Sequence, residues 1–545
     1  LSFIADDEDF NLHLRDAEEM TARLKSVNNQ FQVKKIYLDA YPQESDAAGS
    51  RYPAVNQAIS EDMQKGTLIW NYSGHGGYRR LAEEVVVDHE IADSWQQQGR
   101  LPLFITATCD FAPYDNPAIS SLGEYLLLKP GSGAIALMTT TRLVFAFSNR
   151  IMNSNYLAKA LEPLPGGGFR TLGEAARAAK NLTLQNAGDL VNTLKFTLLG
   201  DPAVTLAFPK YRVQTDSVNG KPVTSEADTI RAQQEVQVTG RITDGQGQLR
   251  PDFNGTVNIQ VMDKPYARKT LGNDPGSLAE EFMVQDQFLY RGKATVRGGK
   301  FSFSFVVARD ISYTAGLAAI RYYAMDSLTD AQGFFDQLPI GGSVTGPVDN
   351  QGPAIGAWLN DRQFRDGGLT GEKPLLLLDL ADSSGINVLG NGIGHDITVI
   401  IDGDTRNPLV LNAFFETVND TYRRGGLQFR LPEMADGNHT LTIKAWDVLN
   451  NSSETTLRFT VKNSRRLVVE SAIAWPNPSA GEVRFGISHN RGNEPLQALV
   501  ELFLINGQLV KRIPGTIIGS GNRSYIAWNG RDDRGNLVSP GIYFY

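Results

Sequence analysis

The sequence predicts a multidomain protein, in which one α/β domain with a mostly parallel, helix-covered sheet is followed by three β-sandwich modules. Up to about residue 208, short apolar runs alternate with helical periodicity, which is typical of a sheet covered by helices. After Pro209, runs of alternating polarity that are rich in Val and Thr take over, separated by turn residues. The chain has 545 residues, too many for one hydrophobic core. We therefore expect domains at residues 1–209, 210–347, 348–464 and 465–545.

The elements of the first domain follow from the spacing of its apolar residues. Short apolar runs predict strands, whereas apolar residues at three- to five-residue intervals predict helices. In chain order, we expect strands at 1–5, 34–38, 67–72, 101–108 and 133–138, and helices at 12–26, 52–65, 122–128, 158–161 and 172–181. This alternation favours a parallel sheet, because parallel strands need long crossover connections.

The rest of the chain has the alternation expected of half-buried strands. It is clearest at residues 235–239, 258–261 and 301–307, at 438–447, and at 500–508. Strands of this length between turn signals are typical of Ig-like β-sandwiches, one for each of the three later domains.

Charge and composition exclude several classes of protein. The chain carries 52 Lys and Arg against 60 Asp and Glu, a net charge of −8, and no basic block that would follow a phosphate backbone. No stretch approaches the roughly 20 apolar residues that cross a bilayer. A single cysteine cannot form an intramolecular disulfide. Because the sequence starts without Met or a signal-like segment and stops in a strand-like pattern, we expect a piece of a longer protein that lacks its N-terminal portion.

The chain's only cysteine, Cys109, follows one apolar run, and His75 follows the preceding run inside the sequence Ser-Gly-His-Gly-Gly. A thiolate is the reactive form of cysteine, and an imidazole can take its proton and later donate one to a leaving amine. Glycines beside His75 leave room for a substrate, and the backbone N–H groups of Gly76 and Cys109 would form an oxyanion hole. A lone buried cysteine is more often inert core. The two motifs at consecutive strand ends favour a nucleophile and its base instead.

Acidic residues 6–9 directly follow the first predicted strand. Functional groups gather at the carboxyl ends of strands in such sheets, so one of these carboxylates would orient the imidazole. The alternatives are a solvated acidic loop or a structural calcium site. No pair of His stands at metal-ligand spacing and there is no second Cys, so we expect no zinc site and no required cofactor.

These motifs resemble those of clan CD cysteine peptidases, in which one apolar block ends in Gly-His-Gly and the next in Ala/Thr-Cys. Further segments are similar to the gingipain family, peptidase family C25, in particular: 101–104, 121–125, 133–136 with 139–141, and 196–202. The resemblance implies a caspase- or gingipain-like catalytic domain. It makes Cys109 the nucleophile, His75 the general base and acid, and Asp7 the acidic partner, with the neighbouring Asp6 as the alternative.

The resemblance also assigns a wall of the substrate pocket to Thr140, Thr141 and Phe145. Members of the family that cleave after Arg or Lys place an acidic residue in this pocket. No equivalent acidic residue is found here, so trypsin-like specificity is not implied.

The tail resembles the C-terminal sorting domains of secreted cargo, at residues 475–478, 504–510 and 528–543. Catalytic motifs and tail together are similar to the gingipain-like sortases of the type IX secretion system. That resemblance implies removal of the sorting domain from cargo and transfer of the new carboxyl end, through a Cys109 thioacyl-enzyme, to a lipopolysaccharide amine. It also implies a peripheral position on the outer face of the bacterial outer membrane, and a PorV-like β-barrel partner bound through the C-terminal domain. A secreted protease that only hydrolyses and a non-catalytic surface scaffold remain alternatives.

Overall fold

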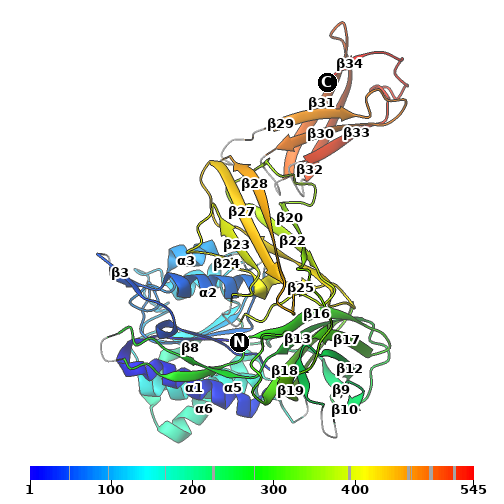
Figure 1. Ribbon diagram of the computed structural model, residues 1–545. Coiled ribbons are helices and arrows are strands. Elements are labelled where there is room, and N and C mark those ends of the chain that lie inside the picture. The colour runs from blue at the N-terminus through cyan, green and yellow to red at the C-terminus, as the bar shows by residue number, and fades with distance from the viewer. Residues whose placement is uncertain are drawn as a thin grey trace.

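The computed structural model describes the chain except residues 48, 96, 98, 166, 224–227, 275–276, 391–393, 463–466, 468, 490–494 and 519–522. Its first domain is built on a six-stranded sheet in the order β2-β1-β5-β6-β7-β8 (Figure 1). These strands are β1 (Ser2–Ala5), β2 (Lys34–Tyr37), β5 (Ile69–Ser73), β6 (Leu103–Ala107), β7 (Ala136–Thr140) and β8 (Phe196–Leu199). All neighbours pair in parallel except β8, which runs antiparallel to β7. The mostly parallel sheet is therefore present, while its caspase-like character stays a prediction.

Helices cover both faces of this sheet, as Figure 1 shows. One face carries α1 (Glu8–Val27), α5 (Ala146–Leu161) and α6 (Leu172–Ala187), and the other carries α2 (Pro53–Lys65) and α3 (His89–Ser94). Helix α7 (Leu190–Lys195) contacts α5 and α6, and α4 (Leu122–Leu128) contacts α3. Adjacent residues of one strand point to opposite faces, so Leu103 joins the core under α1 and α5 while Phe104 packs against Trp70 in the core under α2. Apolar residues are buried on both faces, as is usual for parallel sheets.

Several elements differ from the prediction. Helix α5 begins at Ala146, well before the helix expected at 158–161, because its buried face includes the polar residues Asn149 and Asn153, which hide the apolar periodicity. Helices α3 and α7, the 3-10 helix η1 (Leu38–Ala40) and the hairpin of β3 (Glu44–Asp46) and β4 (Gly49–Arg51) were not expected. All four elements are short, so their sequences carry little periodicity.

The first β region forms one sheet in the order β16-β13-β18-β19-β9-β12-β17, with β10 paired to β9 and β11 to β19. Its strands are β9 (Tyr211–Val218), β10 (Lys221–Pro222), β11 (Ile230–Ala232), β12 (Glu235–Thr243), β13 (Gly255–Met262), β16 (Phe288–Val296), β17 (Lys300–Val306), β18 (Gly316–Met325) and β19 (Asp330–Ser343). An arm leaves this sheet as the hairpin of β14 (Tyr266–Lys269) and β15 (Glu281–Val284). The arm packs on the α/β domain: Phe282 lies against Tyr37, and the backbone N–H of Leu271 donates to the carbonyl of Asp39.

The second β region has a four-stranded sheet, β20-β22-β26-β25, and a five-stranded sheet, β21-β28-β27-β23-β24, whose apolar residues share one core. These elements are β20 (Ala354–Leu359), β21 (Gly368–Thr370), β22 (Leu375–Ala381), β23 (Thr398–Ile401), β24 (Leu409–Val410), η2 (Asn412–Phe414), β25 (Glu416–Thr417), β26 (Arg424–Arg430), β27 (Gly437–Trp446) and β28 (Ser452–Val461). The boundary expected between residues 464 and 465 lies outside the described residues.

The third β region has two three-stranded sheets, β29-β30-β33 and β32-β31-β34, and Figure 1 shows it projecting from the rest of the molecule. Its strands are β29 (Val469–Trp475), β30 (Val483–His489), β31 (Pro495–Leu504), β32 (Leu509–Ile518), β33 (Arg523–Trp528) and β34 (Tyr543–Phe544). The chain thus consists of an α/β domain and a large β-rich part. The number of Ig-like modules in that part stays a prediction.

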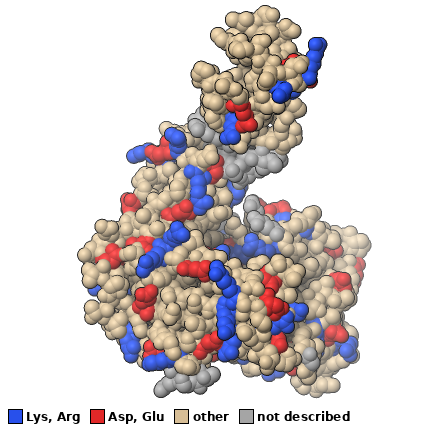
Figure 2. Space-filling view, turned by 90° about the vertical axis from the view of Figure 1, so that its right-hand side faces the viewer, with Lys and Arg blue, Asp and Glu red and all other residues tan. Residues whose placement is uncertain are grey.

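The surface carries charges of both signs. On the face shown in Figure 2, Lys and Arg side chains lie among Asp and Glu side chains, without a continuous basic stripe. Among the helices of the described residues, none combines the length and the hydropathy needed to cross a bilayer.

Candidate active site

The register of two neighbouring strands brings Cys109 and His75 to the same edge of the sheet. Ser73 at the end of β5 is the pairing partner of Ala107 at the end of β6, and His75 and Cys109 each come two residues later. The N–H of Gly74 donates to the carbonyl of Ala107 at 3.4 Å, so the two chains still run together past the strand ends. Neighbouring strands lie about 4.8 Å apart. The thiol and the imidazole predicted from the sequence therefore leave the sheet side by side.

The loop that carries His75 is held by buried groups beneath it. Asp6, directly after β1, accepts a hydrogen bond from the backbone N–H of His75 at 2.7 Å, and the Tyr72 hydroxyl donates to the His75 carbonyl at 2.7 Å. A Cβ atom at Gly74 would lie 2.6 Å from the Tyr72 hydroxyl. Glycine at position 74 is therefore needed for this close approach, and Asp6 acts on the backbone of His75 and not on its ring.

The carboxylate that reaches the His75 ring belongs to Asp9. His75 Nε2 lies 2.9 Å from Asp9 Oδ2, and both side chains are half exposed. The expected partner, Asp7, is instead fully buried and accepts a hydrogen bond from the Tyr52 hydroxyl at 2.5 Å. The expected contact of Asp7, or alternatively Asp6, with the His75 ring is thus wrong in this structure: Asp9 makes that contact, and the catalytic role of each carboxylate stays a prediction.

The backbone explains this difference. Asp9, Phe10 and Asn11 have φ values of 58°, 56° and 63°, in the left-handed region, at the start of α1. Three such residues in a row reverse the direction of the chain after β1. Asp and Asn tolerate this region better than most residues, but Phe10 has no such preference, so the sequence carries only a weak signal for the turn.

In this structure the Cys109 thiol and the His75 ring share no hydrogen bond, although both residues are described. Cys109 is partly buried, and its Sγ donates to the carbonyl of Val144 at 3.6 Å. With Nε2 of His75 engaged by Asp9, the Nδ1 atom is the one left to exchange a proton with Cys109. Catalytic hydrogen bonds in unliganded enzymes are often long and shorten when substrate binds.

Two backbone N–H groups at the site are available to a substrate. Within the described part of the chain, the N–H groups of Gly76 and Cys109 donate to no protein acceptor. Gly76 faces Leu81 as a pair without mutual hydrogen bonds, because the flanking bonds run from Gly77 to Arg80 and from Ala82 to His75. N–H donors next to a nucleophile can bind the oxygen that gains negative charge during acyl transfer.

The residues expected to line a pocket have different environments. Thr140 is fully buried and its hydroxyl donates to the carbonyl of Thr108, so it supports the end of β6 and offers no pocket surface. The hydroxyl of Thr141 donates to the carbonyl of Lys195 at 3.2 Å. Phe145 is 73% exposed, one residue beyond the Val144 carbonyl that receives the Cys109 thiol. Of the three, only Phe145 presents a large side chain to solvent.

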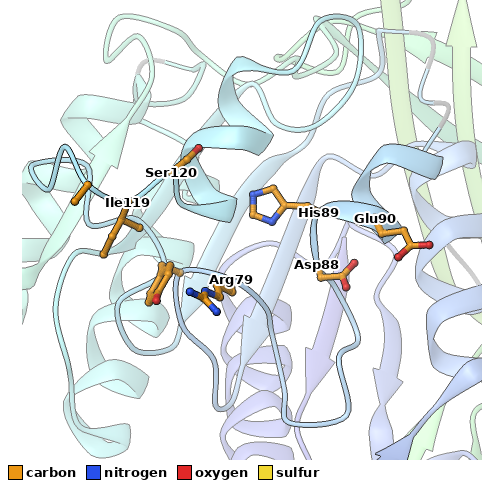
Figure 3. Close-up of a pocket in the computed structure, with 8 residues that line it drawn as sticks. Arg79, Asp88, His89, Glu90, Ile119 and Ser120 are labelled. Carbon is orange, nitrogen blue, oxygen red and sulfur yellow. The ribbon is translucent and has the colours of Figure 1, made fainter. Parts of the chain in front are cut away.

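An open hollow lies on the loops that follow the two proposed catalytic residues. It has a volume of about 590 Å³ and is lined by Tyr78, Arg79, Asp88, His89, Glu90, Ala118, Ile119 and Ser120 (Figure 3). The two loops are tied together, since the N–H of Leu122 donates to the carbonyl of Tyr78 at 2.7 Å. This hollow could not be predicted from the sequence, because its residues come from segments without a regular pattern.

Two groups of side chains near the site contain potential metal ligands. Ligand atoms of Asp9, His13 and His75 lie within 4.8 Å of one another, so the structure joins two His that are far from metal-ligand spacing in the sequence. Burial, aided by the charge of His75, lowers the pKa of His13 to about 4. A metal at this group would occupy the His75 imidazole and compete with its role as a base.

The second group consists of Asp6, Asp7, Glu8 and Glu84. Burial and the neighbouring Glu8 carboxylate raise the pKa of Asp6 well above its usual range. Burial also raises the pKa of Asp7 to about 7, although the Tyr52 hydroxyl acts in the opposite direction. For Glu84, burial and the nearby Asp7 charge raise the pKa to about 7.

The α/β domain with this thiol, imidazole and pair of free N–H groups has the features of a cysteine peptidase. Residues 1–207, which make up this domain, match the model of peptidase family C25. No curated protein sequence matches the chain.

Two solved structures are similar to the chain. Latent dimeric PorU from Porphyromonas gingivalis is 30% identical, over 76% of this chain and 39% of PorU, with a TM-score of 0.31. The Arg-specific cysteine proteinase gingipain R is 14% identical, over 63% of this chain and 66% of that protein, with a TM-score of 0.32. The chain thus spans well under half the length of PorU.

Proposed function

We propose that the chain is a cysteine endopeptidase and transpeptidase that acts on secreted cargo of the type IX secretion system. It would remove the C-terminal sorting domain and transfer the new carboxyl end of the cargo to a lipopolysaccharide amine at the cell surface. The observation that carries the proposal is the register of β5 and β6, which leaves His75 and Cys109 at equal offsets past paired strand ends.

The first half of the reaction follows from the groups at this edge. The Cys109 thiolate attacks the scissile carbonyl, whose oxygen takes the negative charge and accepts hydrogen bonds from the Gly76 and Cys109 N–H groups. The C–N bond then breaks, and His75 donates a proton to the departing amine. Cargo remains attached to Cys109 as a thioester, and the sorting domain leaves with a new amino end.

The second half decides between two activities. An amine that attacks the thioester carbonyl releases the thiol and forms a new amide, whereas water in the same position forms a carboxylic acid. In both cases the attacking group loses a proton, which returns to the sulfur by way of His75. The open hollow beside the two loops is large enough to admit a polar acceptor, and its lining includes both Arg79 and Glu90.

The proposed partners follow from the tail. The sorting-domain-like segments 475–478, 504–510 and 528–543 support binding of the third β region to a PorV-like β-barrel of the outer membrane, on whose outer face the chain would be peripheral. The chemistry needs no cofactor.

The test compares the wild-type protein with Cys109→Ala in the bacterium that makes it, using mass spectrometry of cargo carboxyl ends. We expect the variant to accumulate cargo that retains its sorting domain, and wild-type cargo to end in an amide to an amino sugar. Purified Cys109→Ala should melt close to wild type, because the thiol makes one weak hydrogen bond. Adding hydroxylamine to purified wild type and cargo should yield a cargo hydroxamate, the product of a trapped thioester.

Three results would each contradict part of this proposal. Cargo that ends only in free acids would show a protease that hydrolyses, and no transpeptidase. Normal processing by Cys109→Ala would remove the assignment of the nucleophile. Absence of processing by both proteins, with both folded, would favour the non-catalytic scaffold.

A further inference from the structure

We infer that Asp9, His13 and His75 form a binding site for one zinc ion, and that zinc bound there inhibits the proposed peptidase reversibly. The sequence predicts no zinc site, because the two His residues are far apart along the chain. The structure brings them together, and ligand atoms of the three residues all lie within 4.8 Å of one another. Zinc binding does not depend on the proposed reaction, whereas its inhibitory effect rests on that proposed function.

The main observation is a buried ring nitrogen without a partner. His13 is 5% exposed, and its Nε2 atom is buried and has no hydrogen-bond partner in the described part of the chain. Asp9 Oδ2 lies 3.5 Å away, too far for a good hydrogen bond. Because burial lowers the pKa of His13 to about 4, the ring is neutral near pH 7. A neutral imidazole is the commonest metal ligand in proteins, and a buried nitrogen without a partner indicates a missing ligand.

The spacing of the three donors fits one tetrahedral ion. The Nε2 atoms of His75 and His13 lie 2.9 Å and 3.5 Å from the same oxygen, Asp9 Oδ2. Zinc binds nitrogen and oxygen at about 2.0–2.2 Å, so neighbouring ligand atoms of a tetrahedral site lie about 3.3–3.6 Å apart. The centroids of the two imidazole rings are 5.3 Å apart, with the rings nearly perpendicular. Two imidazoles on one tetrahedral zinc hold their centroids about 5.2 Å apart, because each centroid lies about 3.2 Å from the ion. Only small movements are therefore needed to bind the metal.

The donor set selects zinc. It contains two imidazole nitrogens and one carboxylate oxygen, whereas calcium and magnesium take oxygen ligands. Copper(II) prefers a square-planar arrangement, which the nearly perpendicular rings do not offer. Three protein ligands leave a fourth position for water, as in open zinc sites. The side chains of His75 and Asp9 are half exposed, so an ion can reach the site from solvent.

Zinc at this site would remove the base from the proposed reaction. A neutral imidazole has one proton and one free lone pair. When Nε2 of His75 binds the metal, the proton of the ring lies on Nδ1, which then cannot accept the proton of the Cys109 thiol. The Asp9 charge, which would stabilise the imidazolium, is shared with the ion. Cys109 is not one of the three ligands, and its Sγ donates to the carbonyl of Val144. Removal of zinc would therefore restore an intact thiol and imidazole.

The experiment measures zinc binding on the full chain after removal of metals with a chelator. Isothermal titration with zinc chloride is run in millimolar calcium chloride, so that sites made only of oxygen do not take up zinc. The variant His13→Phe keeps a buried aromatic ring and removes the ligand nitrogen. Its matched control is His439→Phe, because both ring nitrogens of His439 already contact protein oxygens, on Asp402 and Ala435.

Two further variants and two further measurements complete the test. His75→Ala removes a ligand from a half-exposed side chain, so it keeps the test valid if His13→Phe does not fold. Cys109→Ala shows whether the thiol binds the metal. Melting temperatures without zinc check that each variant folds. Cleavage of a cargo peptide is measured with increasing zinc, relative to the zinc-free rate of the same protein, and again after addition of a chelator.

We expect wild type, His439→Phe and Cys109→Ala to bind one zinc ion with equal affinity. The affinity should fall at least tenfold in His13→Phe and in His75→Ala, because each loses one of three protein ligands. Zinc should stop cleavage by wild type, and the chelator should restore it. Half-inhibition of His13→Phe should require at least tenfold more zinc than half-inhibition of wild type or His439→Phe.

Equal zinc affinity of wild type and folded His13→Phe would overturn the inference, as would the absence of zinc binding by wild type. Loss of binding in Cys109→Ala but not in His13→Phe would also overturn it, because the metal would then lie between the thiol and His75. Zinc binding without inhibition would overturn the inhibitory effect alone. If no form of the protein cleaves cargo, the proposed function fails, while the titrations still decide whether the zinc site exists.

Discussion

His75 is joined to Asp9 through its Nε2 atom at 2.9 Å, and the partner is supplied by a left-handed turn at the start of α1. This arrangement leaves Nδ1 out of the contact with Asp9, and the Asp9 charge would stabilise the imidazolium that forms when Cys109 loses its proton. Both side chains are half exposed, so the pair is screened by water and contributes little to stability.

Replacing Asp9 with Asn therefore tests its catalytic role without disturbing the fold. An amide can still accept a hydrogen bond but carries no charge. We expect turnover to fall about tenfold to a hundredfold, below the ~10²–10⁴ that general acid–base catalysis itself contributes. The melting temperature should stay close to that of wild type. Asp7→Asn is the contrasting variant, and a larger loss of turnover from it than from Asp9→Asn, with both folded, would return the orienting role to Asp7.

Position 76 has no room for a side chain, and the N–H group of Gly76 is one of the two proposed to bind the oxyanion. A Cβ atom there would lie 2.8 Å from the Thr108 hydroxyl and 3.0 Å from the Arg80 carbonyl, so Gly76→Ala must displace the N–H group proposed to bind the oxyanion. Loss of one such donor costs about 10²–10³ in turnover. Gly77→Ala is the matched control, since nothing lies within 4 Å of its added Cβ. We expect a steady-state assay to show near-normal turnover for Gly77→Ala. Equal losses in both variants would argue against an oxyanion role for Gly76.

A buried pair of amides connects the strand of His75 to the helix face below it. Asn71 donates to Asn153 at 2.7 Å and Asn153 donates back at 3.0 Å, and both side chains are 1% exposed. Asn71→Ala would leave the other amide without a partner, at a cost of about 1–3 kcal/mol.

The double variant Asn71→Val/Asn153→Leu removes both polar groups, and we expect it to be more stable than Asn71→Ala. The chain has several domains, so a single unfolding curve would mix their transitions. Hydrogen exchange of peptides from α5 measures the effect locally. Additive losses in the double variant would show that the two amides do not depend on each other.

The parts of this fold that were predictable from sequence are those in which adjacent residues of a strand are both apolar. Runs such as 67–72 and 101–108 predict β5 and β6, and the residues after them predict His75 and Cys109 at one edge. Register then follows from the parallel pairing of neighbouring strands. Helix α5 shows the limit of this reasoning, because buried Asn149 and Asn153 pair with other buried amides and interrupt the apolar pattern.

From the sequence, the carboxylate that contacts His75 could be narrowed only to residues 6–9. The sequence shows four carboxylates after β1, but their roles depend on a turn with three left-handed residues, which sends Asp9 to His75 and keeps Asp6 and Asp7 buried. Nothing in the sequence indicates that Glu84 lies near Asp6 and Asp7, because it is far along the chain and reaches them from another loop. Such contacts depend on tertiary structure and not on local pattern.

Phe145 provides a test of where substrate binds. It is 73% exposed directly after Val144, whose carbonyl receives the Cys109 thiol, so an apolar substrate side chain next to the scissile bond would cover it. Burial of apolar surface contributes about 25 cal/mol per Å², so we expect Phe145→Ala to raise KM about tenfold and to change kcat little. Leu128→Ala is the control: this residue is 77% exposed, but it ends a helix that runs back from the catalytic edge toward the start of β7. Cleavage kinetics on a cargo peptide compare the two variants. An unchanged KM in Phe145→Ala would exclude this side chain from the substrate contact. An equal rise of KM in Leu128→Ala would show that the rise comes from a general loss of surface hydrophobicity and not from a local contact with the substrate.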